Sequence, residues 1–69
     1  MRADKEKVAL AMARACVSRM DIAVAARMPE NTVKSVLQGK PVRPATLGRV
    51  AKALGVDPAE LLAEEARTN

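Results

Sequence analysis

The chain contains no Phe, Tyr or Trp, although 49% of its 69 residues are hydrophobic. Sheet cores favour aromatic and β-branched side chains, whereas Ala, Leu, Val, Ile and Met suit closely packed helices. A chain of this length buries only about 60% of its unfolded surface, and such a core supplies roughly 3–5 kcal/mol. The expected architecture is therefore a single all-α domain over residues 1–69, with modest stability.

Apolar residues recur at helical spacing along most of the chain, and start and stop signals divide the pattern into segments. Ser18 and Asp21 stand at the two positions of a capping box. Pro29 suits the first position of a third helix, and Gly39 and Gly55 suit the C-terminal stops of the third and fourth. Asp57 and Glu60 stand at the positions of a second capping box, which opens the last helix. These signals predict a compact five-helix bundle over about residues 4–15, 18–26, 29–38, 44–54 and 57–66. The expected inward residues are Val8, Ala11, Met12, Ala15, Ile22, Ala23, Ala26, Val33, Val36, Leu37, Leu47, Val50, Ala51 and Leu54.

The net charge of +4 is unevenly distributed. Residues 13–56 hold eight Lys or Arg and two Asp or Glu, which gives +6. Residues 57–69 hold four acidic residues and one basic residue, which gives −3. The basic middle indicates either a polyanionic partner or an ordinary solvated surface, and charge alone does not separate the two.

Several functional classes have no support in the sequence. The chain has no His, no Gly-rich phosphate loop and one cysteine, Cys16, with no base beside it. We therefore expect no enzyme activity, no metal or other cofactor and no small-molecule ligand, and interpret Cys16 as a small apolar residue. Neither a signal peptide nor an apolar run of about 18 residues is present, so a cytoplasmic protein without membrane contact is expected.

The segment ARMPENTVKSVLQGK, residues 26–40, combines an apolar stripe with a polar outer face. A capped short helix precedes it, with Ala23 where two steeply crossing helices need a small residue. This order resembles the helix-turn-helix of the phage-repressor (Cro/XRE-type) DNA-binding family, formed by the second and third helices. Residues 39–62, GKPVRPATLGRVAKALGVDPAELL, resemble that family's last two helices. The resemblance covers about residues 5–62.

The chain departs from the family pattern at two places. Arg27 stands in the turn where the family usually has Gly, so either the turn is strained by about 1 kcal/mol or its geometry differs. Some members pair an Arg of the first helix with a Glu of the third. The corresponding positions here are Met12 and Leu37, for which we expect an apolar contact instead.

The resemblance implies that the third helix lies in the major groove of double-stranded DNA. An asparagine such as Asn31 can form two hydrogen bonds with adenine, and a glutamate can accept a hydrogen bond from the cytosine amino group. The methyl group of a threonine can contact the methyl group of thymine. A carboxylate at Glu30 is equally explained by the helix dipole alone. The implied base contacts are Glu30, Asn31, Thr32, Lys34 and Ser35. The implied phosphate contacts are Arg19, Gln38, Lys40 and Arg43.

The function that the resemblance implies is sequence-specific DNA binding by a small prokaryotic, phage or mobile-element regulator, most simply a repressor. Family members usually pair on DNA, so we expect a homodimer, with a small-residue stripe on the last helix as the candidate contact. The alternatives are a protein-interaction module (antitoxin-like or an anti-repressor subunit) and an architectural or excision factor. Met20 and Val24, on the outer face of the second helix, are a weaker candidate for a partner site. The stripe comprises Ala59, Leu62, Ala63 and Ala66.

Overall fold

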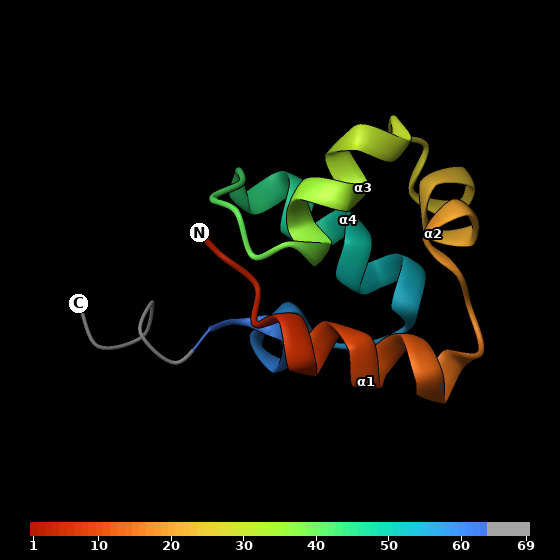
Figure 1. The fold of residues 1–69 in the computed structure, drawn as a ribbon, viewed down its shortest axis with the longest axis horizontal. Helices are drawn as coiled ribbons and strands as arrows, with labels where there is room; N and C mark the ends of the chain where they lie inside the picture. The colour runs from red at the N-terminus through yellow and green to blue at the C-terminus, as the bar shows by residue number, and fades with distance from the viewer. Residues whose placement is uncertain (64–69) are drawn as a thin grey trace.

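The computed structural model describes residues 1–63 and confirms the all-α class for this part of the chain. None of its helices is long and apolar enough to cross a bilayer. Ala3 and Leu62 form an isolated antiparallel bridge, the one sheet-like pairing within residues 1–63. The elements are α1 (Lys5–Ala15), α2 (Arg19–Ala26), α3 (Glu30–Leu37), α4 (Pro44–Leu54) and a short 3₁₀ turn, η1 (Pro58–Leu61) (Figure 1).

The starts of the helices follow the sequence signals with one correction. Asp4 caps α1 by accepting from the backbone N–H groups of Glu6 and Lys7, at 2.9 and 3.2 Å. Pro29 is the N-cap of α3 and not its first helical residue, because its ψ of 145° is extended. Its carbonyl accepts the first helical hydrogen bonds, and α3 begins at Glu30.

All four α-helices end in the same hydrogen-bonding pattern, a Schellman motif around one left-handed residue. In α2 the N–H of Arg27 donates to the carbonyl of Val24, and the N–H of Met28 donates to that of Ala23. The equivalent bonds terminate the other three helices. Glycines occupy the left-handed position after α3 and α4, as predicted, whereas non-glycine residues occupy it after α1 and α2. The four left-handed residues are Cys16, Arg27, Gly39 and Gly55.

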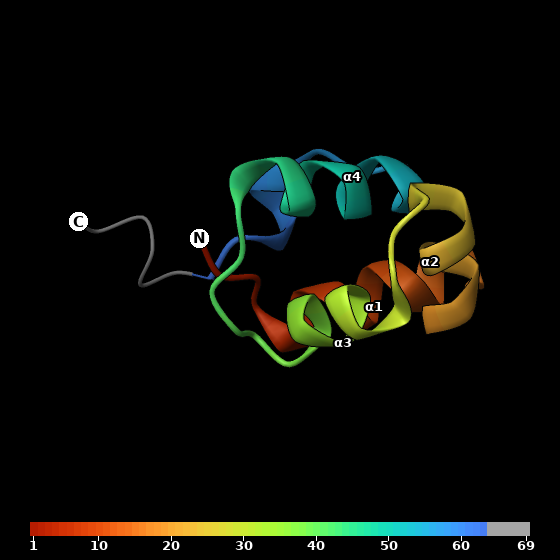
Figure 2. The same ribbon diagram turned by 90° about the horizontal axis from the view of Figure 1, so that it is seen from above.

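The helices surround a core made of aliphatic side chains. Figure 2 shows α4 on one side and α1 with α3 on the other, while α2 closes one end by packing against both α3 and α4. Met12 and Leu37, at the positions of the family's ion pair, both pack against this core. Ala15, expected inside, is exposed. The most deeply buried large side chains are Val8, Ile22, Val33, Val36, Leu47, Val50 and Leu61.

The prediction of five helices is wrong, because residues 1–63 form four α-helices, and the expected helix over 57–66 is a four-residue 3₁₀ element there. Its capping box forms between Asp57 and Glu60, but the helical backbone stops at Leu61, and Leu62 has an extended ψ of 140°. The carbonyl of Leu61 accepts from the N–H of Asp4 at 2.7 Å, and the N–H of Ala63 donates to the carbonyl of Arg2 at 3.1 Å. These bonds to the N-terminal segment replace the bonds that a longer helix would make.

The predicted dimer stripe therefore has no helical face within the described residues. Ala59 is exposed on η1, Leu62 is half-buried in the bridge with Ala3, and Ala63 is buried. Ala66, the fourth member of the stripe, lies outside the described residues. Two of the other three positions thus contribute to the packing of this chain upon itself.

The turn between α2 and α3 contains a left-handed residue that is not glycine, and its backbone strain can be tested by substitution. Arg27 has φ 55° and ψ 50°, so the strained alternative for this turn is correct. A left-handed conformation costs a non-glycine residue about 1–2 kcal/mol of stability, and glycine avoids this cost. Glycine also raises the conformational entropy of the unfolded chain, which offsets roughly 0.5–1 kcal/mol of the gain. We predict that Arg27→Gly raises the melting temperature by roughly 2–8 °C, measured by circular dichroism.

The matched control is Ala9→Gly, which introduces glycine at an exposed position inside α1. It should lower the free energy of unfolding by about 1 kcal/mol. Equal destabilisation by both substitutions would contradict the assignment of strain to Arg27.

Candidate nucleic-acid interface

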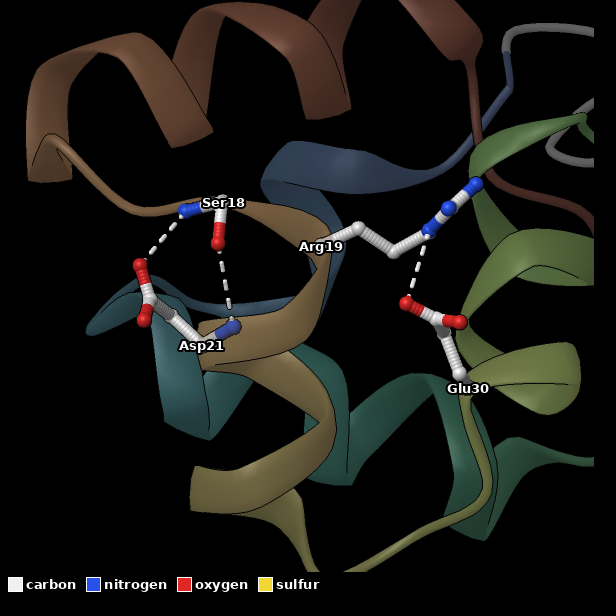
Figure 3. A network of polar contacts seen from close by, with 4 residues as sticks. All are labelled: Ser18, Arg19, Asp21 and Glu30. Carbon is white, nitrogen blue, oxygen red and sulfur yellow. Dashed lines mark hydrogen bonds and ion pairs between the residues drawn. The ribbon is translucent and has the colours of Figure 1, made fainter.

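The start of α2 is a fully formed capping box (Figure 3). The backbone N–H of Asp21 donates to Ser18 Oγ at 3.2 Å, and the N–H of Ser18 donates to Asp21 Oδ2 at 2.8 Å. The hydrogen bond from the Ser18 backbone, followed by that from its side chain, lowers the pKa of Asp21 below its ordinary value. Asp21 is therefore ionised at neutral pH, and the box fixes the direction in which α2 leaves the loop.

Arg19 and Glu30, the first residues of α2 and α3, form an ion pair. Arg19 Nε lies 3.5 Å from Glu30 Oε2, and Figure 3 shows the two side chains reaching toward each other between the helix starts. Their side chains are 45% and 42% exposed. An exposed pair of this kind contributes about 0–1 kcal/mol, so a stronger anion can displace Glu30 at little cost.

The two sides of α3 differ as the sequence predicts. Val33 and Val36 are completely buried and anchor the helix against the core. Asn31 and Lys34 are exposed, while Ser35 is half-buried and donates its hydroxyl hydrogen to the carbonyl of Asn31 at 3.1 Å. The outward side of α3 thus presents amide, ammonium and hydroxyl groups without a large apolar side chain.

The N-terminus of α3 lacks a side-chain cap, because its N-cap is Pro29. The first N–H groups of a helix carry partial positive charge and attract anions. Glu30 supplies a negative charge beside them from within the first turn. This arrangement favours a carboxylate at Glu30 without any base contact.

The loop after α3 carries the exposed side chains of Gln38, Lys40 and Arg43. The N-terminal segment holds this loop, because Val42 N–H donates to the carbonyl of Met1 at 2.7 Å and the Met1 amino group donates to the carbonyl of Val42 at 3.0 Å. A side chain in place of Gly39 would also meet the carbonyl of Ala3.

Among the predicted site residues, the structure brings Arg19 and Glu30 into direct contact and places the others along one helix and its following loop. This ion pair was not predicted from the sequence. Opposite charges at the first positions of two adjacent helices are a visible signal, but only the crossing of the helices brings them together. The role of residues 1–3 in holding the 38–43 loop was also missed, because their backbone makes the hydrogen bonds.

A family profile described as a helix-turn-helix domain matches residues 6–63. No curated protein matches the chain. Solved structures of PhpD with cadmium align with a TM-score of 0.77 at 30% identity, over 93% of this chain. A mutant of hydroxyethylphosphonate dioxygenase aligns with a TM-score of 0.78, also at 30% identity. In each case this chain spans only 14% of the other protein's length, so the likeness concerns one segment of a much larger chain.

Proposed function

Because the chain belongs to the helix-turn-helix domain family, we propose that it binds double-stranded DNA with α3 in the major groove. The observation that carries the proposal is the exposed polar side of α3, which lies between two sets of cations. Arg19 stands at the start of α2, while Lys40 and Arg43 stand in and beside the loop that follows α3. Base-reading groups flanked by phosphate-binding groups are the arrangement that helix-turn-helix recognition requires.

The proposed base contacts are those whose side chains are accessible near the start of α3. Asn31 is exposed and can make a bidentate pair with adenine, and Lys34 can donate to guanine. Ser35 already donates its hydrogen to the carbonyl of Asn31, so toward a base it offers its oxygen as an acceptor. Thr32 is half-buried, which suits a contact through its methyl group with thymine.

Arg19 is proposed to exchange Glu30 for a phosphate when DNA binds. The ion pair is exposed and weak, whereas a phosphate offers the guanidinium two parallel hydrogen bonds. Released from Arg19, Glu30 either accepts from a cytosine amino group or stays at the start of α3 as an unfavourable charge near the backbone. These two roles differ in sequence dependence and are therefore separable by experiment.

The biological role that fits best is a small prokaryotic or phage transcriptional regulator, with a repressor as the simplest form. We propose a homodimer on DNA, whose half-sites would be about 34 Å apart, as is general for this motif. The predicted stripe does not supply the contact as a helical face, so residues 1–63 do not identify the dimer surface. The proposal assigns no catalytic step to the chain.

The second candidate function is a protein-interaction module on the same scaffold. The observation in its favour is that similar folds at 30% identity make up 14% of the PhpD and dioxygenase chains. The polar composition of the exposed side of α3 favours DNA over an apolar protein interface. An architectural or excision factor would make the same DNA contacts as a repressor.

Single substitutions separate backbone clamps from base readers. We predict that Arg19→Ala and Arg43→Ala weaken binding to all duplexes alike and reduce the slope of log affinity against log salt by about one each. Asn31→Ala should instead lose about 1–3 kcal/mol of discrimination at one base pair. Fluorescence anisotropy with a panel of single-base-pair variants measures both effects.

The matched control is Arg14→Ala, which removes an exposed cation from the last turn of α1. It should leave both affinity and salt slope unchanged. If Asn31→Ala weakened every duplex equally, Asn31 would not be a base reader.

Neutralising Glu30 tests the proposed exchange of partners. We predict that Glu30→Gln strengthens binding to duplexes of any sequence by up to about fivefold at low salt, because Arg19 no longer has a competing carboxylate. Glu60→Gln is the control, since it removes the same charge while retaining an acceptor for the capping box of η1. Loss of preference for one cytosine, without a general gain, would show that Glu30 reads a base and does not merely compete for Arg19.

A further inference from the structure

The C-terminal ends of α2 and α4 form a shallow groove that the proposed DNA contacts do not use. Figure 2 shows the end of α4 beside α2, and the two helices pack against each other. None of the lining residues comes from α3 or from the 38–43 loop. The groove is lined by Ala25, Ala26, Arg27, Arg49, Lys52 and Ala53.

Three cations and three alanines line this groove. The guanidinium of Arg49 makes a long hydrogen bond of 3.5 Å to the carbonyl of Arg27, which ties the two rims together. Within residues 1–63, neither arginine nor Lys52 pairs with a carboxylate. The groove therefore presents cations without a carboxylate partner in residues 1–63, beside the small apolar side chains of the alanines.

Two large apolar side chains lie beside the groove on the outer face of α2. Met20 is 56% exposed and Val24 is 73% exposed. Met20 and Val24 follow i and i+4, so they lie on one face of α2, and Val24 is next in the chain to Ala25, which lines the groove. Phosphates would gain little from this apolar pair, whereas a peptide with both apolar and acidic side chains would bury the pair and neutralise the cations.

A second copy of this chain is a poor match for the surface. Most carboxylates of residues 1–63 are already engaged, as helix caps or in the pair with Arg19. The engaged groups are Asp4, Asp21, Glu30, Asp57 and Glu60. Within residues 1–63 only Glu6 remains outside these contacts, so the described part of the chain does not supply a complementary acidic segment.

We propose that Met20, Val24, Arg27, Arg49 and Lys52 form a docking surface, hereafter the α2–α4 surface, for an acidic amphipathic segment of a partner protein. The segment places a large apolar side chain against Met20 and Val24 and its carboxylates over the cationic rim. The exposed apolar area is small, so binding is reversible and suited to a regulatory contact. Because the α2–α4 surface leaves α3 uncovered, the partner can bind while α3 occupies DNA.

The test selects short random peptides, displayed on phage, against the immobilised full chain. The expected outcome is enrichment of peptides that combine Asp or Glu with large apolar residues at helical spacing. Nitrogen-15 NMR with one selected synthetic peptide should show shifts concentrated in residues 20–27 and 49–53. Absence of such enrichment, or shifts centred on α3, would overturn the proposal.

Matched variants then show which residues contribute to the affinity for the selected peptide. Val24→Gln, Arg49→Gln and Lys52→Gln should each weaken the selected peptide by about tenfold. Leu10→Gln and Arg14→Gln, an exposed apolar residue and an exposed cation on α1, should change it by no more than about twofold. Circular dichroism checks that all five exposed substitutions retain the fold.

The same variants distinguish an acidic peptide from the two other possible ligands of the surface, which are DNA and a second copy of the chain. Duplex DNA should bind the three α2–α4 variants within about twofold of the unaltered chain. If Arg49→Gln and Lys52→Gln weakened DNA and left the peptide unaffected, the groove would belong to the DNA interface. If Val24→Gln and Arg49→Gln abolished self-association in sedimentation and left the peptide unaffected, the partner would be a second copy. Either result would overturn the docking proposal and leave the proposed function of α3 intact.

Discussion

The left-handed residue between α2 and α3 sets the position of α3 relative to α2 in the proposed interface. Arg27 reverses the chain within one residue, and the hydrogen bonds from Arg27 and Met28 lock that reversal onto the end of α2. Ala23, a small residue of α2, is buried, and α2 packs against α3. With this crossing fixed, Arg19 and Glu30 meet, although the chain places ten residues between one helix start and the other. A change in the turn would move the polar side of α3 and the cation at α2 relative to each other.

At the other end of α3, backbone hydrogen bonds hold the loop that follows the helix. Residues 1–3 run between the 38–43 loop and the segment 61–63, and hydrogen-bond to both. Leu61, fully buried, anchors that last segment in the core. The loop with Lys40 and Arg43 is therefore held by groups far away in the sequence, which gives the two proposed phosphate contacts a defined place relative to α3.

The sequence predicted the features that depend on local chemistry. The capping box at Ser18, the extent of α4 and the glycine stops after α3 and α4 are decided by residues within one turn of each other. Burial of Val33 and Val36 follows from helical spacing alone. For the site, the same spacing separated the polar side of α3 from its buried side.

What the sequence did not predict depends on tertiary contacts. The capping box at Asp57 indicated a full helix, but pairing of residues 61–63 with the N-terminal segment ended it after one turn. The Arg19–Glu30 pair requires the crossing of two helices, and the α2–α4 groove requires the packing of α2 against α4. Membership of the helix-turn-helix family supports a DNA partner, but the bases that α3 prefers depend on side-chain geometry at the groove.

The most direct test of the central claim is selection of bound duplexes from a random pool, with the full chain and at both low and moderate salt. The account predicts an enriched consensus that persists at moderate salt and changes at one base pair when Asn31 is replaced by Ala. A palindromic consensus would also support the proposed homodimer. Failure to enrich any sequence, with binding lost at moderate salt, would leave only non-specific affinity and contradict the assignment of α3 as a reader of DNA sequence.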